Sequence, residues 1–384
     1  MKVLILASNR TLTLSLLRCL SGAGIRAHVL ANGNYPVVRA SRWCSGFDRF
    51  DPQLVHIGSP TLARMTGELA IKNGCEVILP SGIEAVKYLS AHARAIEQVP
   101  IIPLAEPHVI TMLDDKWRFQ RFACEAGVTT PAGELFTDVK SVSAKSLTFP
   151  LVVKPTTLDG SRGVKAVHNQ LQLIEHISTI SKNGTPAIML QEYIPGDDIS
   201  ISMLASAGRV VAWAVHTWVG KDHDLQFIYD SDVMRAAARL VAASKFDGLI
   251  NFDFRRHKKT GELYALECNP RPYASIHIAM CAGINFAKLA IDTALGIPIS
   301  DIMVPSDRVI HPERALIQLI TGKARRSQLS PATLRGLELD QNDALASLVR
   351  LVEKYTPGLS RYLDSAPNRP SANTFAVPET AKWR

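Results

Sequence analysis

Two neighbouring segments of the sequence carry oxygen-bearing side chains at a spacing that suits a metal ion. They read NFDF at residues 251–254 and LECNPR at residues 266–271. Because side chains alternate along a strand, Asp253 lies on the face opposite its two phenylalanine neighbours, and Glu267 shares a face with Asn269. A hairpin between the two strands brings these three side chains together. Two carboxylates and an amide oxygen predict a Mg²⁺ site that also holds phosphates, with ordinary strand-end polar pairs as the alternative.

A lysine within an apolar strand is the second feature that indicates chemistry. Lys154 follows Leu-Val-Val, and a buried ammonium group is costly unless an anion compensates its charge. The next segment, TTLDGSRG at residues 156–163, contains two glycines and a serine, and the amides of such a loop are able to cover phosphates. It lacks the G-x-x-x-x-G-K-[ST] pattern of a P-loop and leads into a strand. The alternative is a surface hairpin whose lysine extends to solvent.

A third segment, QEYIPGDD at residues 191–198, is predicted to be a strand that runs into a turn ending in two acids. Backbone groups of such a strand are able to bind the edge of an adenine, and an acid is able to bind ribose hydroxyls. An exposed turn without a ligand is an equally good interpretation of these residues taken alone.

The elements that must position these segments begin with a Rossmann-like unit at residues 1–110. Short apolar strands at Val3–Ala7 and Ile25–Leu30 flank a helix at Thr11–Leu20, and this alternation predicts a parallel sheet. The first turn reads Ala-Ser-Asn-Arg-Thr and lacks the glycines of a dinucleotide site, so NAD binding is not expected. A proline-rich connector at residues 100–107 marks the end of this unit.

The rest of the chain is predicted to contain two further parts. Residues 111–300 contain short adjacent strands separated by glycine turns, which predicts antiparallel hairpins. Residues 301–384 have helical leucine spacing and then a Pro- and Ser-rich end, which predicts a helical C-terminal extension with a flexible tail. The predicted fold class is therefore α/β, with an α+β middle part.

Composition limits the classes of protein to which the chain can belong. With 384 residues, 47% of them hydrophobic, it has enough apolar side chains for two or three domains with cores. The six cysteines are scattered without a C-x-x-C pair, which predicts reduced thiols and a cytoplasmic protein. The net charge of +8 is spread without a basic stripe, so nucleic-acid binding is not expected. No apolar run approaches the ~18 residues of a membrane helix, so a membrane association is not expected either.

Taken in this order, the segments resemble the ATP-grasp superfamily, in particular the carbamoyl-phosphate-synthase-like carboxylate–amine ligases. The resemblance rests on Asp115-Lys116 at a helix start, Val-Val-Lys154-Pro, the glycine loop, QEYIPG, Asp253, and Glu267-x-Asn269-Pro-Arg271. It implies a pre-ATP-grasp domain at residues 1–110 and an ATP-grasp domain at 111–300 with a mobile β-rich lid at about 129–190. The helical extension at 301–384 follows these two domains.

The resemblance also implies roles for the matched residues and a requirement for ATP and Mg²⁺, with Mn²⁺ as a substitute. The ATP contacts are Lys116 and Lys154 at the phosphates, Gly160, Ser161, Arg162 and Gly163 over the γ-phosphate, Glu192, Tyr193 and Ile194 at the adenine, and Asp198 at the ribose. The implied metal ligands are Asp253, Glu267 and Asn269, and the implied catalytic residues are Lys154 and Arg271. Many members carry Glu or Gln at the position of Asp253, and Glu is commoner than Asp at position 198.

The activity that the resemblance implies joins a carboxylic acid, such as an amino acid, to an amine, both of them small molecules. A substrate carboxylate attacks the γ-phosphate of ATP to give an acyl phosphate and ADP, and the amine then displaces phosphate. Two alternatives stay open, a carboxylase or carbamoyl-phosphate-type enzyme that uses bicarbonate, and an ATP-binding module without catalytic activity. We expect Trp218–Asp230 to border the pocket, and we single out His277 as a candidate substrate contact. A two-fold homodimer is the default oligomer.

Overall fold

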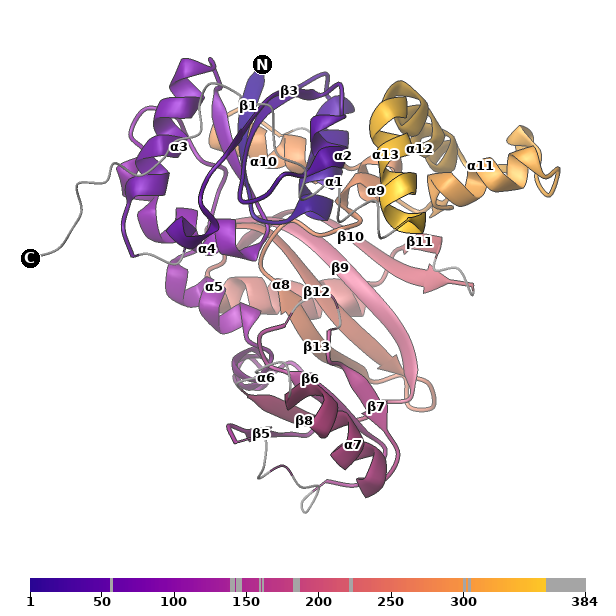
Figure 1. Ribbon diagram of the computed structural model, residues 1–384. Helices are drawn as coiled ribbons and strands as arrows, with labels where there is room; N and C mark the ends of the chain where they lie inside the picture. Colours follow the sequence, from indigo (N-terminus) through magenta and orange to yellow (C-terminus); the bar gives the residue numbers. More distant parts are fainter. Residues whose placement is uncertain are drawn as a thin grey trace, which may run out of the picture. The chain divides into compact units, whose positions relative to one another are not determined.

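The computed structural model describes residues 1–55, 58–138, 142, 147–158, 160, 162–181, 187–220, 224–299, 302 and 305–356. The chain forms two units (Figure 1), one that joins Met1–Leu104 with Arg271–Arg384 and one that comprises Ala105–Pro270. Both units combine helices with sheets or strands, so the predicted mixed α/β class is confirmed. The domain boundaries at residues 110 and 300 and the lid at about 129–190 stay predictions. None of the described helices combines the length and the apolar character that crossing a membrane requires.

The N-terminal part of the first unit is a parallel sheet with the strand order β3-β2-β1-β4. Its elements are β1 (Lys2–Ala7), α1 (Arg10–Ser21), β2 (Arg26–Ala31), α2 (Pro36–Arg39), β3 (Cys44–Arg49), α3 (Thr61–Lys72), β4 (Val77–Ser81) and α4 (Ile83–His92). The turn after β1 starts a helix because the Asn9 side chain accepts a hydrogen bond from the Leu12 amide at 3.1 Å.

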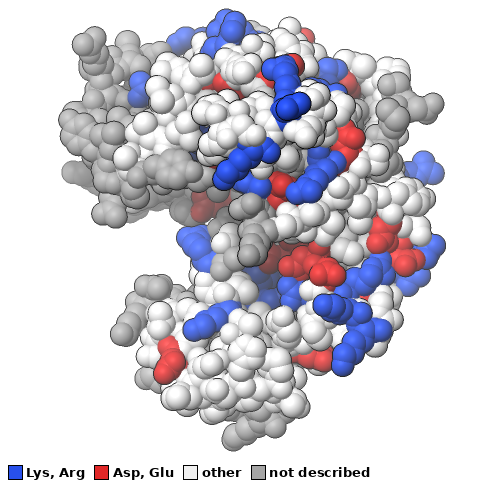
Figure 2. All heavy atoms as spheres, turned by 90° about the vertical axis from the view of Figure 1, so that its right-hand side faces the viewer, with Lys and Arg blue, Asp and Glu red and all other residues white. Residues whose placement is uncertain are grey.

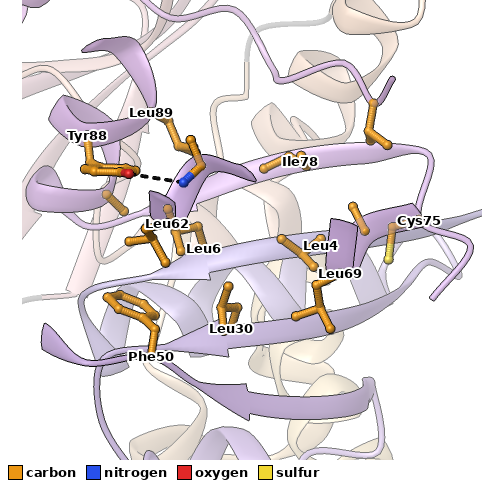
Figure 3. Close-up of a cluster of buried hydrophobic side chains, with 14 of the residues drawn as sticks. Leu4, Leu6, Leu30, Phe50, Leu62, Leu69, Cys75, Ile78, Tyr88 and Leu89 are labelled. Atoms are coloured by element: carbon orange, nitrogen blue, oxygen red, sulfur yellow. Dashed lines mark hydrogen bonds between the residues drawn. The ribbon is translucent and has the colours of Figure 1, made fainter. Parts of the chain in front are cut away.

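An apolar core packs against one face of this sheet (Figure 3). Leu4 and Leu6 of β1 point to the same face, since side chains alternate along a strand, and they pack in one buried cluster with Leu62 of α3. Tyr88 of α4 belongs to the same cluster, and its hydroxyl accepts a hydrogen bond from the Ala63 amide at 3.1 Å. Each fully buried side chain of this size stabilises the unit by roughly 1.5–3 kcal/mol.

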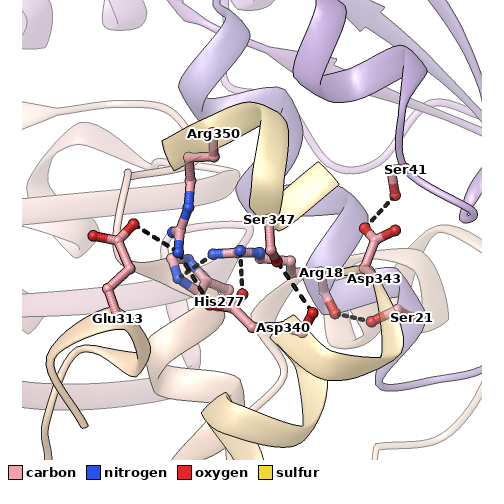
Figure 4. A network of polar contacts seen from close by, with 9 residues as sticks. All are labelled: Arg18, Ser21, Ser41, His277, Glu313, Asp340, Asp343, Ser347 and Arg350. Carbon is pink, nitrogen blue, oxygen red and sulfur yellow. Dashed lines mark hydrogen bonds and ion pairs between the residues drawn. The ribbon is translucent and has the colours of Figure 1, made fainter. Parts of the chain in front are cut away.

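The chain returns to the first unit as helices after it has formed the second. These elements are α9 (Ile276–Cys281), α10 (Phe286–Ala294), β14 (Arg308–Val309), α11 (Pro312–Ile320), α12 (Pro331–Asn342) and α13 (Ala344–Tyr355). Ser15 Oγ of α1 donates a hydrogen bond to the Ala274 carbonyl at 2.7 Å, just before α9 begins. Arg18 of α1 pairs with Asp340 of α12, and Asp340 also accepts from Arg350 of α13 at 3.0 Å (Figure 4). Charged pairs therefore connect the first helix of the chain with its last described helices.

The second unit contains two antiparallel sheets. The small sheet has the order β5-β8-β6-β7, and the strands of the large sheet in this unit run in the order β13-β12-β9-β10-β11. The elements are α5 (Pro107–Asp114), α6 (Lys116–Glu125), β5 (Gly133–Phe136), β6 (Leu151–Pro155), β7 (Lys165–Val167), α7 (Gln170–Ser181), β8 (Ile188–Glu192), β9 (Gly196–Ser206), β10 (Arg209–Val219), β11 (Asp224–Ile228), α8 (Ser231–Ser244), β12 (Gly248–His257) and β13 (Leu263–Asn269).

The two faces of the large sheet differ because polar and apolar residues alternate along β9 and β12. Phe252 and Phe254 are fully buried on one face, and the ring of Phe252 stacks on Phe119 of α6 with centroids 6.1 Å apart. The other face carries three opposed polar pairs across β12 and β9, which are Asn251 with Ser202, Asp253 with Ser200, and Arg255 with Asp198. This polar face is where the residues of the candidate site gather.

Candidate active site

The polar face of the large sheet brings the predicted metal ligands together. Asp253 of β12 stands directly opposite Glu267 of β13, next to a shift in the strand register that marks a bulge. Asn269 lies two residues further along β13, and its Nδ2 donates a hydrogen bond to Asp253 Oδ2 at 3.3 Å. The described residues contain no group of three or more His, Cys, Asp and Glu side chains placed to hold a metal ion. The predicted set consists of two carboxylates and one amide.

Hydrogen bonds fix the Asp253 carboxylate in place. Ser200 Oγ donates to its Oδ1 at 2.6 Å, and Asn251 Nδ2 donates to the same oxygen at 3.0 Å. Burial and the neighbouring charge of Glu267 raise the pKa of Asp253 to about 6, although both hydrogen bonds act in the opposite direction. The two opposed carboxylates therefore repel each other in the protein without a bound cation.

Two buried lysines lie next to these carboxylates. Lys116, at the start of α6, is 4% exposed, and its Nζ donates to the Leu158 carbonyl at 2.7 Å and lies 3.5 Å from Glu267 Oε1. Lys154 of β6 is 7% exposed, and its Nζ donates to Gln191 Oε1 at 2.7 Å. Burial lowers the pKa of Lys154 to about 8, and the Glu267 carboxylate offsets part of this effect. An amide oxygen, not a carboxylate, is thus the hydrogen-bond partner of the Lys154 ammonium group.

The loop between β6 and β7 contains two glycines with positive φ angles. Gly160 and Gly163 have φ angles of 62° and 74°, in the left-handed region that other residues adopt only at a cost. A Cβ atom at Gly163 would lie 2.7 Å from Pro155 Cγ, so the close approach of the loop to β6 also requires glycine. Arg162 is exposed, and Ser161 lies outside the described residues.

The third predicted segment forms the end of β8 and the start of β9. Glu192 is exposed and its amide donates to the Ala132 carbonyl at 2.8 Å, whereas Ile194 is buried. The ring of Tyr193 lies under the guanidinium group of Arg255, which is 5.7 Å from the ring centroid. Arg255 Nε also donates to Asp198 Oδ1 at 2.6 Å. Arg255, on the polar face of the large sheet, therefore contacts this segment through both Tyr193 and Asp198.

A cavity of about 360 Å³ within the second unit brings part of these features together. Lys154, Asp253 and Glu267 line it, whereas the described predicted residues Lys116, Gly160, Arg162, Gly163, Tyr193 and Asn269 do not. Its charged lining residues are Lys154, Glu192, Asp198, Asp253, Arg255 and Glu267. Its apolar walls are Val152, Val164, Ile194, Leu266 and Trp218. Of the segment Trp218–Asp230, which was expected to border the pocket, Trp218 lines the cavity and the other described residues do not.

Seven residues of the cavity were not predicted individually as site residues. Three of them are aliphatic, and the other four are Gln191, Ser200, Trp218 and Arg255. The polar residues at every second position of β9, Asp198, Ser200 and Ser202, are a sequence signal for a polar sheet face.

Two further predicted residues belong to the first unit. Arg271 is the first residue of that unit after Pro270, is buried, and donates from Nη1 to the Pro272 carbonyl at 3.2 Å. Its contact with a phosphoryl group or a substrate carboxylate stays a prediction. His277 Nε2 lies 3.4 Å from Arg18 Nη1 in the polar network of the first unit (Figure 4).

On the face that Figure 2 presents, Lys and Arg side chains are interspersed with Asp and Glu side chains among the described residues.

Comparisons with known proteins show that parts of the chain are similar to ATP-grasp proteins. Residues 184–314 match the family described as ATP-grasp in the biosynthetic pathway with Ter operon. Residues 131–233 match the family described as the D-ala D-ala ligase C-terminus. The resemblance to the ATP-grasp superfamily that the sequence motifs indicated is confirmed by these matches.

Individual relatives support the same fold. The chain is similar to the carbamoyl phosphate synthase large chain of Clostridium beijerinckii, with 22% identity over 227 residues, which are 55% of this chain and 21% of that protein. It resembles the biotin carboxylase domain of the Hydrogenobacter thermophilus 2-oxoglutarate carboxylase, with a TM-score of 0.58, 20% identity and coverage of 79% of this chain and 72% of that one. It also resembles an L-amino acid ligase from Bacillus licheniformis, with a TM-score of 0.57, 17% identity and coverage of 77% and 74%. The chain spans about 21% of the curated synthase that it matches.

Proposed function

We propose that the chain binds ATP and Mg²⁺ in the cavity of its second unit and uses them to join a small-molecule carboxylate to an amine. One observation carries the proposal: buried Lys154 lines the same cavity as the opposed carboxylates Asp253 and Glu267. A buried cation beside paired acids suits a phosphate chain held together with a metal ion. The related biotin carboxylase domain was solved in complex with MgADP and bicarbonate.

Asp253, Glu267 and Asn269 would hold the metal. Their side chains offer the hard oxygen atoms that Mg²⁺ prefers and that Mn²⁺ accepts. Burial and then the charge of Glu267 raise the pKa of Asp253, and a bound cation would offset both effects by stabilising the charged carboxylates. The bound ion would neutralise charge on the phosphate oxygens during transfer.

The phosphates would lie against the two lysines. Lys154 is available to them because its present hydrogen-bond partner is a neutral amide. Lys116 would lie at the same end of the cavity, since its Nζ is 3.5 Å from Glu267. The glycine loop at residues 160–163, with Ser161 and Arg162, would cover the γ-phosphate with backbone amides.

The nucleoside would lie at the end of the cavity formed by β8 and β9. Glu192, Tyr193 and Ile194 would border the adenine, and Asp198 would bind the ribose hydroxyls. Half of the Asp198 side chain is exposed, at 49%, so one carboxylate oxygen has room for a ligand beside the bond from Arg255.

The chemistry follows from this arrangement in two steps. A carboxylate oxygen of the substrate attacks the γ-phosphorus, the bond from that phosphorus to the bridging oxygen breaks, and ADP leaves. The amine nitrogen then attacks the acyl carbon, phosphate leaves, and the nitrogen releases a proton. Lys116 and Lys154 offset the negative charge that develops on the phosphate oxygens. A closed glycine loop would keep water from the acyl phosphate.

A carboxylase or carbamoyl-phosphate-type reaction is the second candidate. It uses the same first step with bicarbonate as the acid, and both the bicarbonate-bound carboxylase domain and the carbamoyl phosphate synthase relative favour it. The third candidate is an ATP-binding module without turnover. Because the carboxylase domain is described as a dimer, we also propose a two-fold homodimer for this chain.

The test is a screen of paired acids and amines for the release of ADP from MgATP. We expect ADP only when both substrates are present, and hydroxylamine should trap the acyl phosphate as a hydroxamate. ADP release that requires bicarbonate would favour the second candidate. Binding of MgADP without turnover under any pairing would favour the third, and a protein that does not bind MgADP would contradict all three.

A matched pair of variants connects the activity to the site. Glu267→Gln should abolish ADP release while circular dichroism shows an intact fold. Glu262→Gln is the control, because Glu262 is an exposed residue of the same hairpin whose carboxylate accepts a hydrogen bond from the Tyr264 hydroxyl. Equal loss of activity in both variants would contradict the metal assignment.

A further inference from the structure

Trp218 is a feature of the cavity to which the proposed reaction gives no role. It lies near the end of β10, its side chain is 40% exposed, and it forms part of the cavity wall together with Asp198. A large, partly exposed indole in the wall of a cavity offers an apolar surface for a ligand.

The strand register places Trp218 relative to the predicted metal ligands. β9 lies between β12 and β10, and Thr217 pairs with Ile199, so Trp218 stands beside Asp198. Thr217 Oγ1 of β10 donates a hydrogen bond to the Asp198 carbonyl of β9 at 2.8 Å, which stabilises this register. Asp253 is two strands and two residue positions away from Trp218 on the same face, which corresponds to roughly 12 Å at ordinary strand spacing. Trp218 therefore lies at the Asp198 end of the cavity and away from the metal end.

The indole is held from one side by His216. The two rings meet edge to face, with centroids 5.9 Å apart and an interplanar angle of 85°. His216 is 3% exposed, and burial lowers its pKa to about 4, so the imidazole is neutral near pH 7. A ring that packs against a buried neighbour while 40% of its side chain stays exposed is partly ordered before a ligand arrives, which reduces the entropy lost on binding.

We propose, on the basis of the function proposed above, that Trp218 packs against the nucleoside of the bound nucleotide. This contact makes the cavity bind a nucleotide more tightly than a chain of phosphates that has no nucleoside. Contact between an aromatic side chain and a base or sugar adds affinity without any hydrogen bond. The lysines and the metal ligands bind the phosphates, so the two groups of residues contribute to separate parts of the ligand.

The first test compares two ligands that share a phosphate chain. Trp218→Ala should weaken the binding of MgADP about tenfold, within the range for loss of one stacked aromatic residue. The binding of magnesium tripolyphosphate, which has no nucleoside, should change less than about twofold, since no contact with the indole is involved. Calorimetric titration of the full chain measures both affinities.

The second test uses the fluorescence of the protein and a matched tryptophan. Trp213 lies five residues earlier on β10, on the opposite face, and packs against Tyr229 with ring centroids 5.7 Å apart. MgADP should change the emission of the wild-type protein and of Trp213→Phe, but not that of Trp218→Phe. If Trp218→Ala does not fold by circular dichroism, the fluorescence of the Phe variants decides the question.

The outcomes separate this inference from the function on which it rests. If wild-type protein binds MgADP while Trp218→Ala binds it equally well, the role of Trp218 is wrong and the proposed function stands. The same holds if Trp218→Phe keeps the full fluorescence response. If Trp218→Ala loses affinity for tripolyphosphate to the same extent, the residue acts on the whole site and the inference is overturned. Failure of the wild-type protein to bind MgADP overturns both.

Discussion

At the scale of single residues, the cavity contains a lysine whose positive charge has a neutral hydrogen-bond partner. The Lys154 ammonium group is buried and bonds to the side-chain oxygen of Gln191, and Gln191 Nε2 in turn donates to Gln120 Oε1 at 2.8 Å. This chain of amides fixes the position of the ammonium group without neutralising it. An anion that enters the cavity therefore finds a charge that is already oriented and poorly solvated.

The protonation of Lys154 should control nucleotide affinity. Because burial lowers its pKa to about 8, the ammonium group is present below that pH and is lost as the pH rises through it. The dissociation constant of MgADP should be constant near pH 7 and rise by up to about tenfold for each pH unit above about 8. Lys154→Met should bind weakly with a flat profile, whereas the exposed Lys165→Met should follow the wild-type profile. An unchanged profile in Lys154→Met, measured by calorimetry, would contradict the assignment.

Asp253 should reduce stability in the protein without metal. Its pKa is raised from 3.8 to about 6, so the charged form is disfavoured on folding, and this penalty is absent below about pH 4 and complete above about pH 6. Asp253→Asn should therefore stabilise the metal-free protein at pH 7 by about 1–3 kcal/mol, since one pKa unit corresponds to about 1.4 kcal/mol and the asparagine loses the oxygen that accepts from Asn269, and this gain should be absent at pH 4. Thermal melts in EDTA and in Mg²⁺ measure this, and Mg²⁺ should stabilise the wild-type protein alone. A variant that melts below wild type at pH 7 in EDTA would refute the prediction.

At the scale of the elements, two strands and their hairpin position the three predicted metal ligands. The alternation along residues 251–254 and 266–271 was sufficient to predict that Asp253, Glu267 and Asn269 share a face, because strand periodicity and a short hairpin are local properties. Trp218 was only expected near the pocket, since its place depends on β9 pairing between β12 and β10. That order is a long-range property, and sequence periodicity does not encode it.

The loop between β6 and β7 should tolerate an added methyl group at only one of its two glycines. An alanine at either Gly160 or Gly163 must adopt a positive φ angle, which costs roughly 1–2 kcal/mol. At Gly163 the new Cβ also meets Pro155 Cγ at 2.7 Å, whereas nothing lies within 4 Å at Gly160. Gly163→Ala should thus lower the free energy of unfolding by about 1–3 kcal/mol more than Gly160→Ala, a range typical of overpacking. Urea unfolding of both variants measures the difference, and equal values would show that the loop shifts freely.

At the scale of the whole molecule, the first unit depends on contacts between distant parts of the chain. Ser41 Oγ donates to Asp343 Oδ2 at 2.6 Å, across 302 residues of sequence. Arg350 of α13 lies 2.8 Å from Glu313 of α11 as well as near Asp340 (Figure 4). The sequence predicted helices in this region but not what they pack against, because an amphipathic helix does not specify its partner.

Asp340 should be the most sensitive residue of this network. It is 16% exposed and pairs with both Arg18, which is 5% exposed, and Arg350. Asp340→Asn removes the charge that balances Arg18, so the free energy of unfolding should fall by about 3 kcal/mol. The control is Asp232→Asn, which breaks an exposed pair with Arg235 and should cost less than about 1 kcal/mol. Urea denaturation that gives equal losses for the two variants would contradict this ranking.

The division of the first unit between Met1–Leu104 and Arg271–Arg384 has a consequence for biosynthesis. A ribosome makes a protein from its N-terminus, so the early strands and α1 emerge long before α9–α13, with which Arg18 and Ser41 pair. The second unit is continuous in sequence, and all its strands are available once residue 270 has left the exit tunnel. Vectorial synthesis therefore favours completion of the second unit before the first, because α1 emerges from the ribosome well before the helices with which it pairs.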